Sequence, residues 1–131
     1  MIKVDAETAR AELERFLELA DTDTAPPDAK ARDDFAQLSH VVVRAIMQGR
    51  ITVDERGLPT VHPRTEGHHP VVFKEPTGAT LVATDSKGAD RDVAKTFAAM
   101  SDQTGTPIKH FSMMHGKDVT LCTAVFSLFL G

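Results

Sequence analysis

The sequence predicts a single α+β domain that spans residues 1–131. Three observations support this fold class. Apolar residues recur at helical spacing in residues 1–49, short β-rich runs broken by turns occupy residues 50–85, and helical spacing returns in residues 86–131. Because helices and strands are segregated along the chain, we expect an N-terminal helix pair, a small antiparallel sheet or hairpin, and a C-terminal segment of three helices.

The N-terminal segment predicts two helices joined by a proline-containing linker. Over residues 5–20, apolar residues recur every three or four positions, and Asp5 stands where an N-cap is expected. The linker, residues 21–28, holds two successive prolines that stop a continuing helix. Asp28 predicts the cap of the second helix, and Gly49 fits the left-handed residue that follows a helix end.

Residues 50–85 predict short strands. Residues 50–63 contain two extended runs around a polar turn that ends in Gly57, which is the pattern of a hairpin. Residues 69–75 and 79–85 predict two further strands, with a proline and glycine turn between them. Because these strands are segregated from the helices, we expect a small antiparallel sheet or hairpin and not a doubly wound parallel sheet.

The last third of the chain predicts three helices. The first covers about residues 89–102. Thr106 followed by Pro107 predicts the cap and first residue of a short second helix. Asp118 predicts the cap of a closing helix that runs to Leu130.

Charge and composition exclude several classes of function. The net charge is -4 and no basic stripe is present, so we expect no nucleic-acid partner. Cys122 is the only cysteine, which rules out an internal disulfide and favours a reducing compartment. The N-terminus lacks the pattern of a signal peptide, and the most apolar segment, residues 119–130, is too short to span a bilayer. We therefore expect a soluble cytosolic protein without a membrane partner.

A histidine cluster raises the question of a metal site. His62, Glu66, His68 and His69 offer nitrogen and oxygen ligands within a short stretch. However, adjacent residues on a strand point to opposite sides, so His68 and His69 are not expected to face one ion. Solvated loop histidines are the favoured interpretation, and no metal site or cofactor is predicted.

The other candidate chemistry also has simpler explanations. Gly78 does not continue into a phosphate-binding loop, because Ala83 stands where the second glycine is required. Cys122 lies in the most apolar helix, where a thiol behaves as a small buried hydrophobe. Met113 and Met114 have histidines close by in sequence, but packing is favoured over a soft-metal site. No catalytic residue is predicted, and the chain is not expected to be an enzyme.

The closing helix is apolar on nearly every side. Two alternatives remain open: it is the central core helix, or part of its apolar surface meets another subunit or a client protein. The candidate protein-interaction residues are Leu121, Val125, Phe126, Leu128, Phe129 and Leu130.

Residues 50–131 also resemble a known family. The hairpin "ITVDERGLPTVHP", the turn "VVFKEPTGA", an Ala-rich helix, a "TG" break and the closing "KDVTLCTAVFSLFL" are similar to tail assembly chaperones of tailed bacteriophages, including the Mu-like group. Those proteins carry a Lys/Arg-Glu-Pro turn, then Leu-Thr-Gly, then an Asp before an apolar helix. Here residues 73–76, Thr104 with Gly105, and Asp118 correspond. The N-terminal helix pair and its linker have no counterpart in this pattern.

The resemblance implies a non-enzymatic function in the host cytoplasm. Such proteins coat the tape-measure protein until the tail tube polymerises around it, so the implied partner is a tape-measure or other tail protein, with a homo-oligomer as a further expectation. On this hypothesis Val125, Phe126, Phe129 and Leu130 carry client or self contacts. The alternative is a structural subunit of the virion: a tail-tube, head–tail connector or capsid-associated protein.

Overall fold

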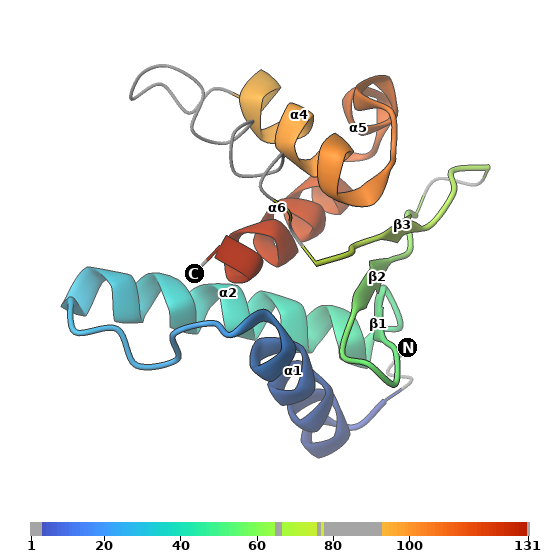
Figure 1. The fold of residues 1–131 in the computed structure, drawn as a ribbon. Helices are drawn as coiled ribbons and strands as arrows, with labels where there is room; N and C mark the ends of the chain where they lie inside the picture. The colour runs from blue at the N-terminus through green and yellow to red at the C-terminus, as the bar shows by residue number, and fades with distance from the viewer. Residues whose placement is uncertain (1–3, 65–66, 76, 78–92, 131) are drawn as a thin grey trace.

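The computed structural model describes residues 4–64, 67–75, 77 and 93–130, and its architecture is α+β as predicted (Figure 1). In chain order the elements are α1 (Ala6–Ala20), α2 (Ala29–Met47), β1 (Ile51–Val53), β2 (Pro59–Val61), β3 (Val71–Val72), α4 (Val93–Thr104), α5 (Ile108–Met113) and α6 (Gly116–Leu130). Figure 1 shows α6 between the α1–α2 pair on one side and α4 with α5 on the other, and the sheet at one end of α2.

The caps of the first two helices are confirmed. The Asp5 carboxylate accepts a hydrogen bond from the backbone N–H of Thr8 at 2.7 Å, and the Asp28 carboxylate accepts one from Ala31 at 3.0 Å. Each bond satisfies an N–H that has no partner inside its helix. Gly49 has a φ of 76° just after α2, which is the left-handed conformation expected there.

The sheet is a three-stranded antiparallel meander in the order β1-β2-β3. Its register places Ile51 opposite Val61, and Val61 opposite Val71. All three side chains are buried, so this row of the sheet faces the helices. The predicted hairpin and third strand are confirmed, whereas residues 79–85, predicted as a fourth strand, lie outside the described residues.

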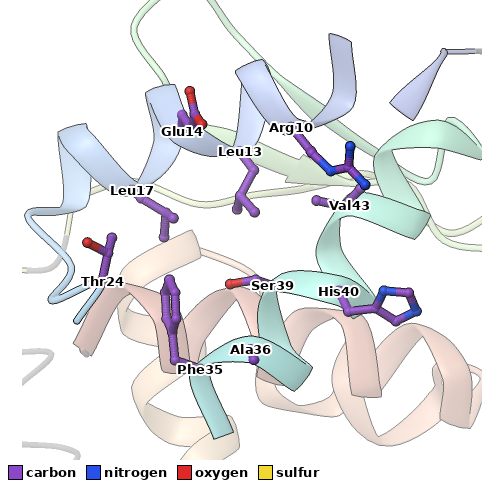
Figure 2. Close-up of a pocket in the computed structure, with 10 residues that line it drawn as sticks. All are labelled: Arg10, Leu13, Glu14, Leu17, Thr24, Phe35, Ala36, Ser39, His40 and Val43. Carbon is purple, nitrogen blue, oxygen red and sulfur yellow. The ribbon is translucent and has the colours of Figure 1, made fainter. Parts of the chain in front are cut away.

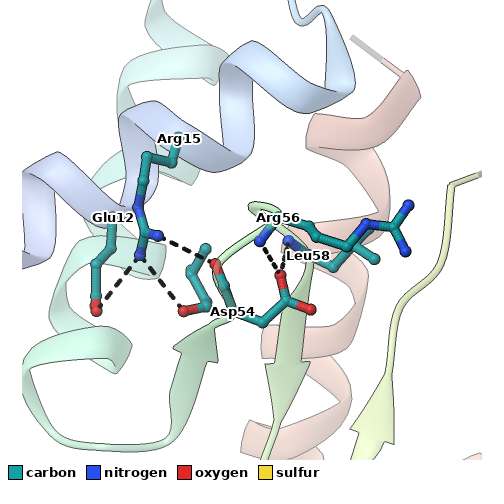
Figure 3. Close-up of polar contacts among 6 residues, drawn as sticks. Glu12, Arg15, Asp54, Arg56 and Leu58 are labelled. Carbon is teal, nitrogen blue, oxygen red and sulfur yellow. Dashed lines mark hydrogen bonds and ion pairs between the residues drawn. The ribbon is translucent and has the colours of Figure 1, made fainter.

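The hairpin turn is fixed both internally and against α1. The Asp54 carboxylate accepts hydrogen bonds from the backbone N–H groups of Arg56 and Leu58, both at 2.9 Å. From α1, the Arg15 guanidinium donates to the carbonyl of Asp54 at 3.1 Å (Figure 3). These contacts hold the turn in place against the first helix.

Gly57 in this turn lies close to the backbone of α1. Its φ is 94°, and a Cβ added there would lie 2.8 Å from the carbonyl oxygen of Arg15. We expect Gly57→Ala to lower the free energy of unfolding by about 2–3 kcal/mol, because both a positive φ and a backbone clash must be accommodated. Urea denaturation measures this loss.

Gly67 provides the matched control for that substitution. Its φ is 88°, but a Cβ added there would meet nothing within 4 Å. Gly67→Ala should therefore cost only the backbone strain, about 1 kcal/mol. Equal losses for the two variants would contradict the close approach of the turn to α1.

The main core forms where α6 meets α1, α2 and the sheet. The rings of Phe16 and Phe129 meet edge to face with centroids 4.9 Å apart, and the Phe73 ring stacks on Phe129 at 6.2 Å. A second aromatic contact, between Phe97 and Phe111 at 5.7 Å, joins α4 to α5. The two contacts of Phe129 join α6 to α1 and to the segment after β3, which are far from it in the sequence. Helix α6 is therefore central to the fold.

The starts of the last two helices differ from prediction. Pro107 has a φ of -58° and a ψ of 143°, so it precedes α5 and is not the first helical residue, and no side chain caps this helix. Helix α6 begins at Gly116, and the Nδ1 atom of His115 accepts a hydrogen bond from the N–H of Lys117 at 3.1 Å. Asp118 lies inside the first turn of α6 and does not cap the helix.

Asp118 instead forms a buried ion pair. Its carboxylate is fully buried and accepts hydrogen bonds from the backbone N–H of Arg64 at 2.7 Å and from the Arg64 Nε at 3.2 Å. The prediction of a cap was wrong because the carboxylate points to the segment after β2 and away from its own helix end. The pair therefore joins that segment to α6.

Candidate functional site

The apolar residues of α6 lie in the core. Leu121, Val125, Phe126, Leu128 and Phe129 have exposed fractions between 0% and 7%, and the Leu130 side chain lies outside the described part of the structure. Within this chain, α1, α2 and the sheet cover these five residues. In this conformation the five side chains pack in the core, and their contact with a client or a second subunit stays a prediction.

A cleft of about 560 Å³ lies instead between α1 and α2 (Figure 2). Such a volume is typical of binding sites in proteins. Its walls are ten residues from the two helices and the linker: Arg10, Leu13, Glu14, Leu17, Thr24, Phe35, Ala36, Ser39, His40 and Val43.

The cleft has an apolar base and a polar rim. Figure 2 shows Leu13 and Leu17 pointing from α1 toward the side of α2 that carries Phe35. Both leucines are buried, whereas Phe35 and Val43 are only partly covered by the chain. The two helices therefore leave apolar surface between them that the rest of the described chain does not cover.

One polar group inside the cleft has no partner. The hydroxyl oxygen of Ser39 is shielded from solvent and makes no hydrogen bond to any described residue. A buried hydroxyl without a partner loses its hydration and gains nothing in return.

Charge changes along the cleft. A smaller adjoining cleft of about 260 Å³ is bordered by Glu14, Glu18 and Asp21, so the end of α1 nearest the linker is acidic. Arg10 lies one turn of α1 before Glu14, and His40 lies opposite on α2. The charges at the two ends of the cleft can therefore orient a partner, and the apolar side chains between them can bury its apolar face.

Sequence reasoning did not find this cleft, although a signal was present. It recognised an apolar stripe on each helix, and the stripe on α2 extends toward the N-terminus as far as Phe35. The buried residues of α2 begin only at Val42. The apolar stripe of α2 is longer than the part of it that is buried, so some of the stripe remains accessible to a partner. The sequence alone does not show how much of the stripe α1 covers.

The histidines that are close together in the sequence have different neighbours in the structure. The Nε2 atom of His62 forms a hydrogen bond with the Thr52 hydroxyl at 2.8 Å across the hairpin. The rings of His68 and His110, whose association was not predicted, have centroids only 4.8 Å apart. Glu66 lies outside the described residues. Over the described ranges, no three side chains of His, Cys, Asp or Glu gather in a metal-binding arrangement.

The environment of His110 disfavours its charged form. Burial lowers the pKa of this imidazole most, and the nearby His68 lowers it further. A hydrogen bond to the backbone of His69 raises the pKa in opposition. Neutral imidazole is therefore the preferred form of His110 at pH 7.

Cys122 is buried in α6, and this burial raises the pKa of its thiol to about 12, with a smaller contribution from the Asp118 carboxylate. The thiolate is the reactive form, so we expect negligible modification of the folded chain by a disulfide reagent at pH 8. Addition of a denaturant should release one reactive thiol per chain. Rapid stoichiometric reaction without denaturant would contradict the burial of Cys122.

Among the helices that the structure describes, none combines the length and apolar character needed to cross a bilayer. No family model, curated protein or solved structure matches this chain.

Proposed function

We propose that this chain is a non-enzymatic binding protein that holds an amphipathic helix of a partner in the α1–α2 cleft. We further propose that it is a tail assembly chaperone, and that the partner is the tape-measure protein of a tailed phage in the host cytoplasm. The observation that supports binding is the cleft itself, with partly uncovered apolar side chains between two charged helices. The resemblance in residues 50–131 supports the specific partner.

The size of the cleft suits a short helical segment. From Arg10 to Leu17 it follows two turns of α1, which is roughly 10 Å. An amphipathic helix of the same length presents apolar side chains at positions i, i+3 or i+4, and i+7 on one face. Such a segment would cover Phe35 and Val43, two of the partly exposed apolar residues of α2.

The charges favour one orientation of that segment. Glu14, Glu18 and Asp21 at one end of the cleft favour lysine or arginine on the bound helix, whereas Arg10 favours an acidic residue at the other end. Because these side chains lie at the rim, binding should weaken as salt increases. Apolar burial would provide the part of the affinity that does not depend on salt.

A substitution in the wall of the cleft tests this proposal. Ala36 lines the cleft and is exposed, so Ala36→Glu should place a charge in the site without disturbing the core. We expect binding to a phage tape-measure protein to weaken at least tenfold, which is about 1.4 kcal/mol. Co-purification and calorimetric titration measure the loss.

Ala11→Glu is the matched control, because Ala11 is exposed on α1 and does not line the cleft. It should bind as the unmodified chain does. Equal weakening by both substitutions, or by neither, would contradict the cleft as the binding site. Absence of any complex with the tape-measure protein would contradict the chaperone function.

Mass spectrometry of infected-cell lysate and finished particles separates the chaperone from a structural subunit of the virion. A chaperone is expected in the lysate and absent from the particle. A fixed copy number in finished particles would replace the chaperone proposal with a structural function, and the cleft would then be an interface between subunits.

A further inference from the structure

His68 and His110 form a close pair although they are distant in sequence. His68 lies in the segment before β3, and His110 lies on α5. The ring centroids are 4.8 Å apart, and the ring planes are inclined by 47°. The two rings therefore form a direct contact between the segment before β3 and the short helix α5.

Each ring has one nitrogen in a position that does not favour an N–H group. The Nδ1 atom of His68 and the Nε2 atom of His110 are both shielded from solvent, and neither has a hydrogen-bond partner among the described residues. A neutral imidazole can carry its only proton on the other nitrogen, whereas a charged imidazole carries a proton on both. Charging either ring would therefore leave a buried donor without an acceptor, next to a second imidazole.

The nearby titratable side chains add to this cost. Those of His68 and His69 both act on His110, and both disfavour a positive charge there. The charged residues on α5 and on α4, the helix that packs against it, are Lys109, Lys95 and Asp102. Lys109 and Asp102 are exposed to solvent, and the Lys95 side chain lies outside the described part of the structure. The contact therefore suits two neutral rings better than charged ones.

The direction of the pH effect follows from the pKa of His110, which burial and the nearby His68 lower from the ordinary value of 6.5. As the pH falls below 6.5, the unfolded chain takes up this proton before the folded chain does. The stability that the contact contributes is therefore fully present above about pH 6.5, and it is lost as the pH falls toward the lower pKa of the folded chain.

We propose that the contact between His68 and His110 is a pH-sensitive switch, which holds α5 against the segment before β3 when both rings are neutral and opens in acid. The contact of Phe97 with Phe111, which joins α4 to α5, contains no titratable group, so acid should leave it in place. The switch lies outside the α1–α2 cleft and does not depend on the function proposed for that cleft.

Nuclear magnetic resonance of the unmodified chain tests the proposal without a substitution. Long-range ¹H–¹⁵N spectra follow the protonation of each ring from about pH 7.5 down to the pH at which His110 is charged. We expect nuclear Overhauser cross-peaks between the rings of His68 and His110 at the start, and at least a fivefold loss of their intensity as His110 becomes charged. The cross-peaks between Phe97 and Phe111 should persist.

Two results of that titration would overturn the proposal. One is that the histidine cross-peaks keep their intensity after His110 is charged. The other is that they disappear only together with those of Phe97 and Phe111, because acid would then unfold the chain as a whole and would not open one contact.

Substitutions provide an independent test through stability. Between about pH 7.5 and 5.5 most carboxylates stay ionised, so a change in the urea midpoint mainly reports histidines. We expect the midpoint of the unmodified chain to fall over this range, and the fall to be at least halved in His110→Gln. His40→Gln is the matched control, because His40 is exposed on α2, and it should show the full decrease. Equal decreases in all three chains would overturn the proposal.

Discussion

Phe129→Ala is expected to lower the free energy of unfolding by about 3–5 kcal/mol, which is the usual cost of removing a buried aromatic ring. Phe129 is 5% exposed and contacts the rings of Phe16 and Phe73. Alanine would leave a cavity where α6 meets α1 and the segment after β3. Urea denaturation followed by circular dichroism measures the loss.

The same substitution decides between the two alternatives for α6. An interface residue can be replaced while the fold stays intact, whereas a core residue cannot. Met113→Ala is the control, because Met113 is 64% exposed and its loss should change stability by no more than about 0.5 kcal/mol. If Phe129→Ala kept full stability and lost only partner binding, the central position of α6 would be wrong.

Local signals in the sequence were sufficient to predict most of the elements. Asp5, Asp28 and Gly49 mark the ends of α1 and α2 through hydrogen bonds and backbone conformations that involve only neighbouring residues. The hairpin is predicted in the same way, because Gly57 supplies the positive φ of its turn. Features fixed by a few adjacent residues are therefore readable without a structure.

The candidate sites depend on contacts between distant segments, and the sequence does not specify these. An apolar helix of this length is compatible with a core and with an interface, and only the packing of α1 and α2 around α6 separates the two. Likewise, His68 and His110 lie on different elements, and nothing in the local pattern of either predicts their contact. The cleft also follows from where α1 and α2 diverge, which is a tertiary property.

The Arg64–Asp118 pair gives the second large effect, because the Asp118 carboxylate is fully buried while the Arg64 side chain is 31% exposed. Arg64→Ala should cost about 2–3 kcal/mol, since a buried carboxylate then keeps only its bond from the backbone N–H of residue 64. Asp118→Ala should cost a similar amount through the lost hydrogen bonds and the cavity. Asp33→Ala, an exposed position on α2, is the control and should be near neutral.

The double variant of this pair separates the charge effect from the loss of packing. Once Asp118 is alanine, removing the Arg64 side chain no longer strands a buried charge, so the combined loss should be smaller than the sum of the two single losses by about 1–2 kcal/mol. Chemical denaturation of all four chains gives this coupling. Strict additivity would show that water reaches the carboxylate and that the ion pair does not hold the segment after β2 against α6. A large coupling would instead identify Asp118 as the residue that fixes this segment to the central helix, although its sequence position is that of a helix cap.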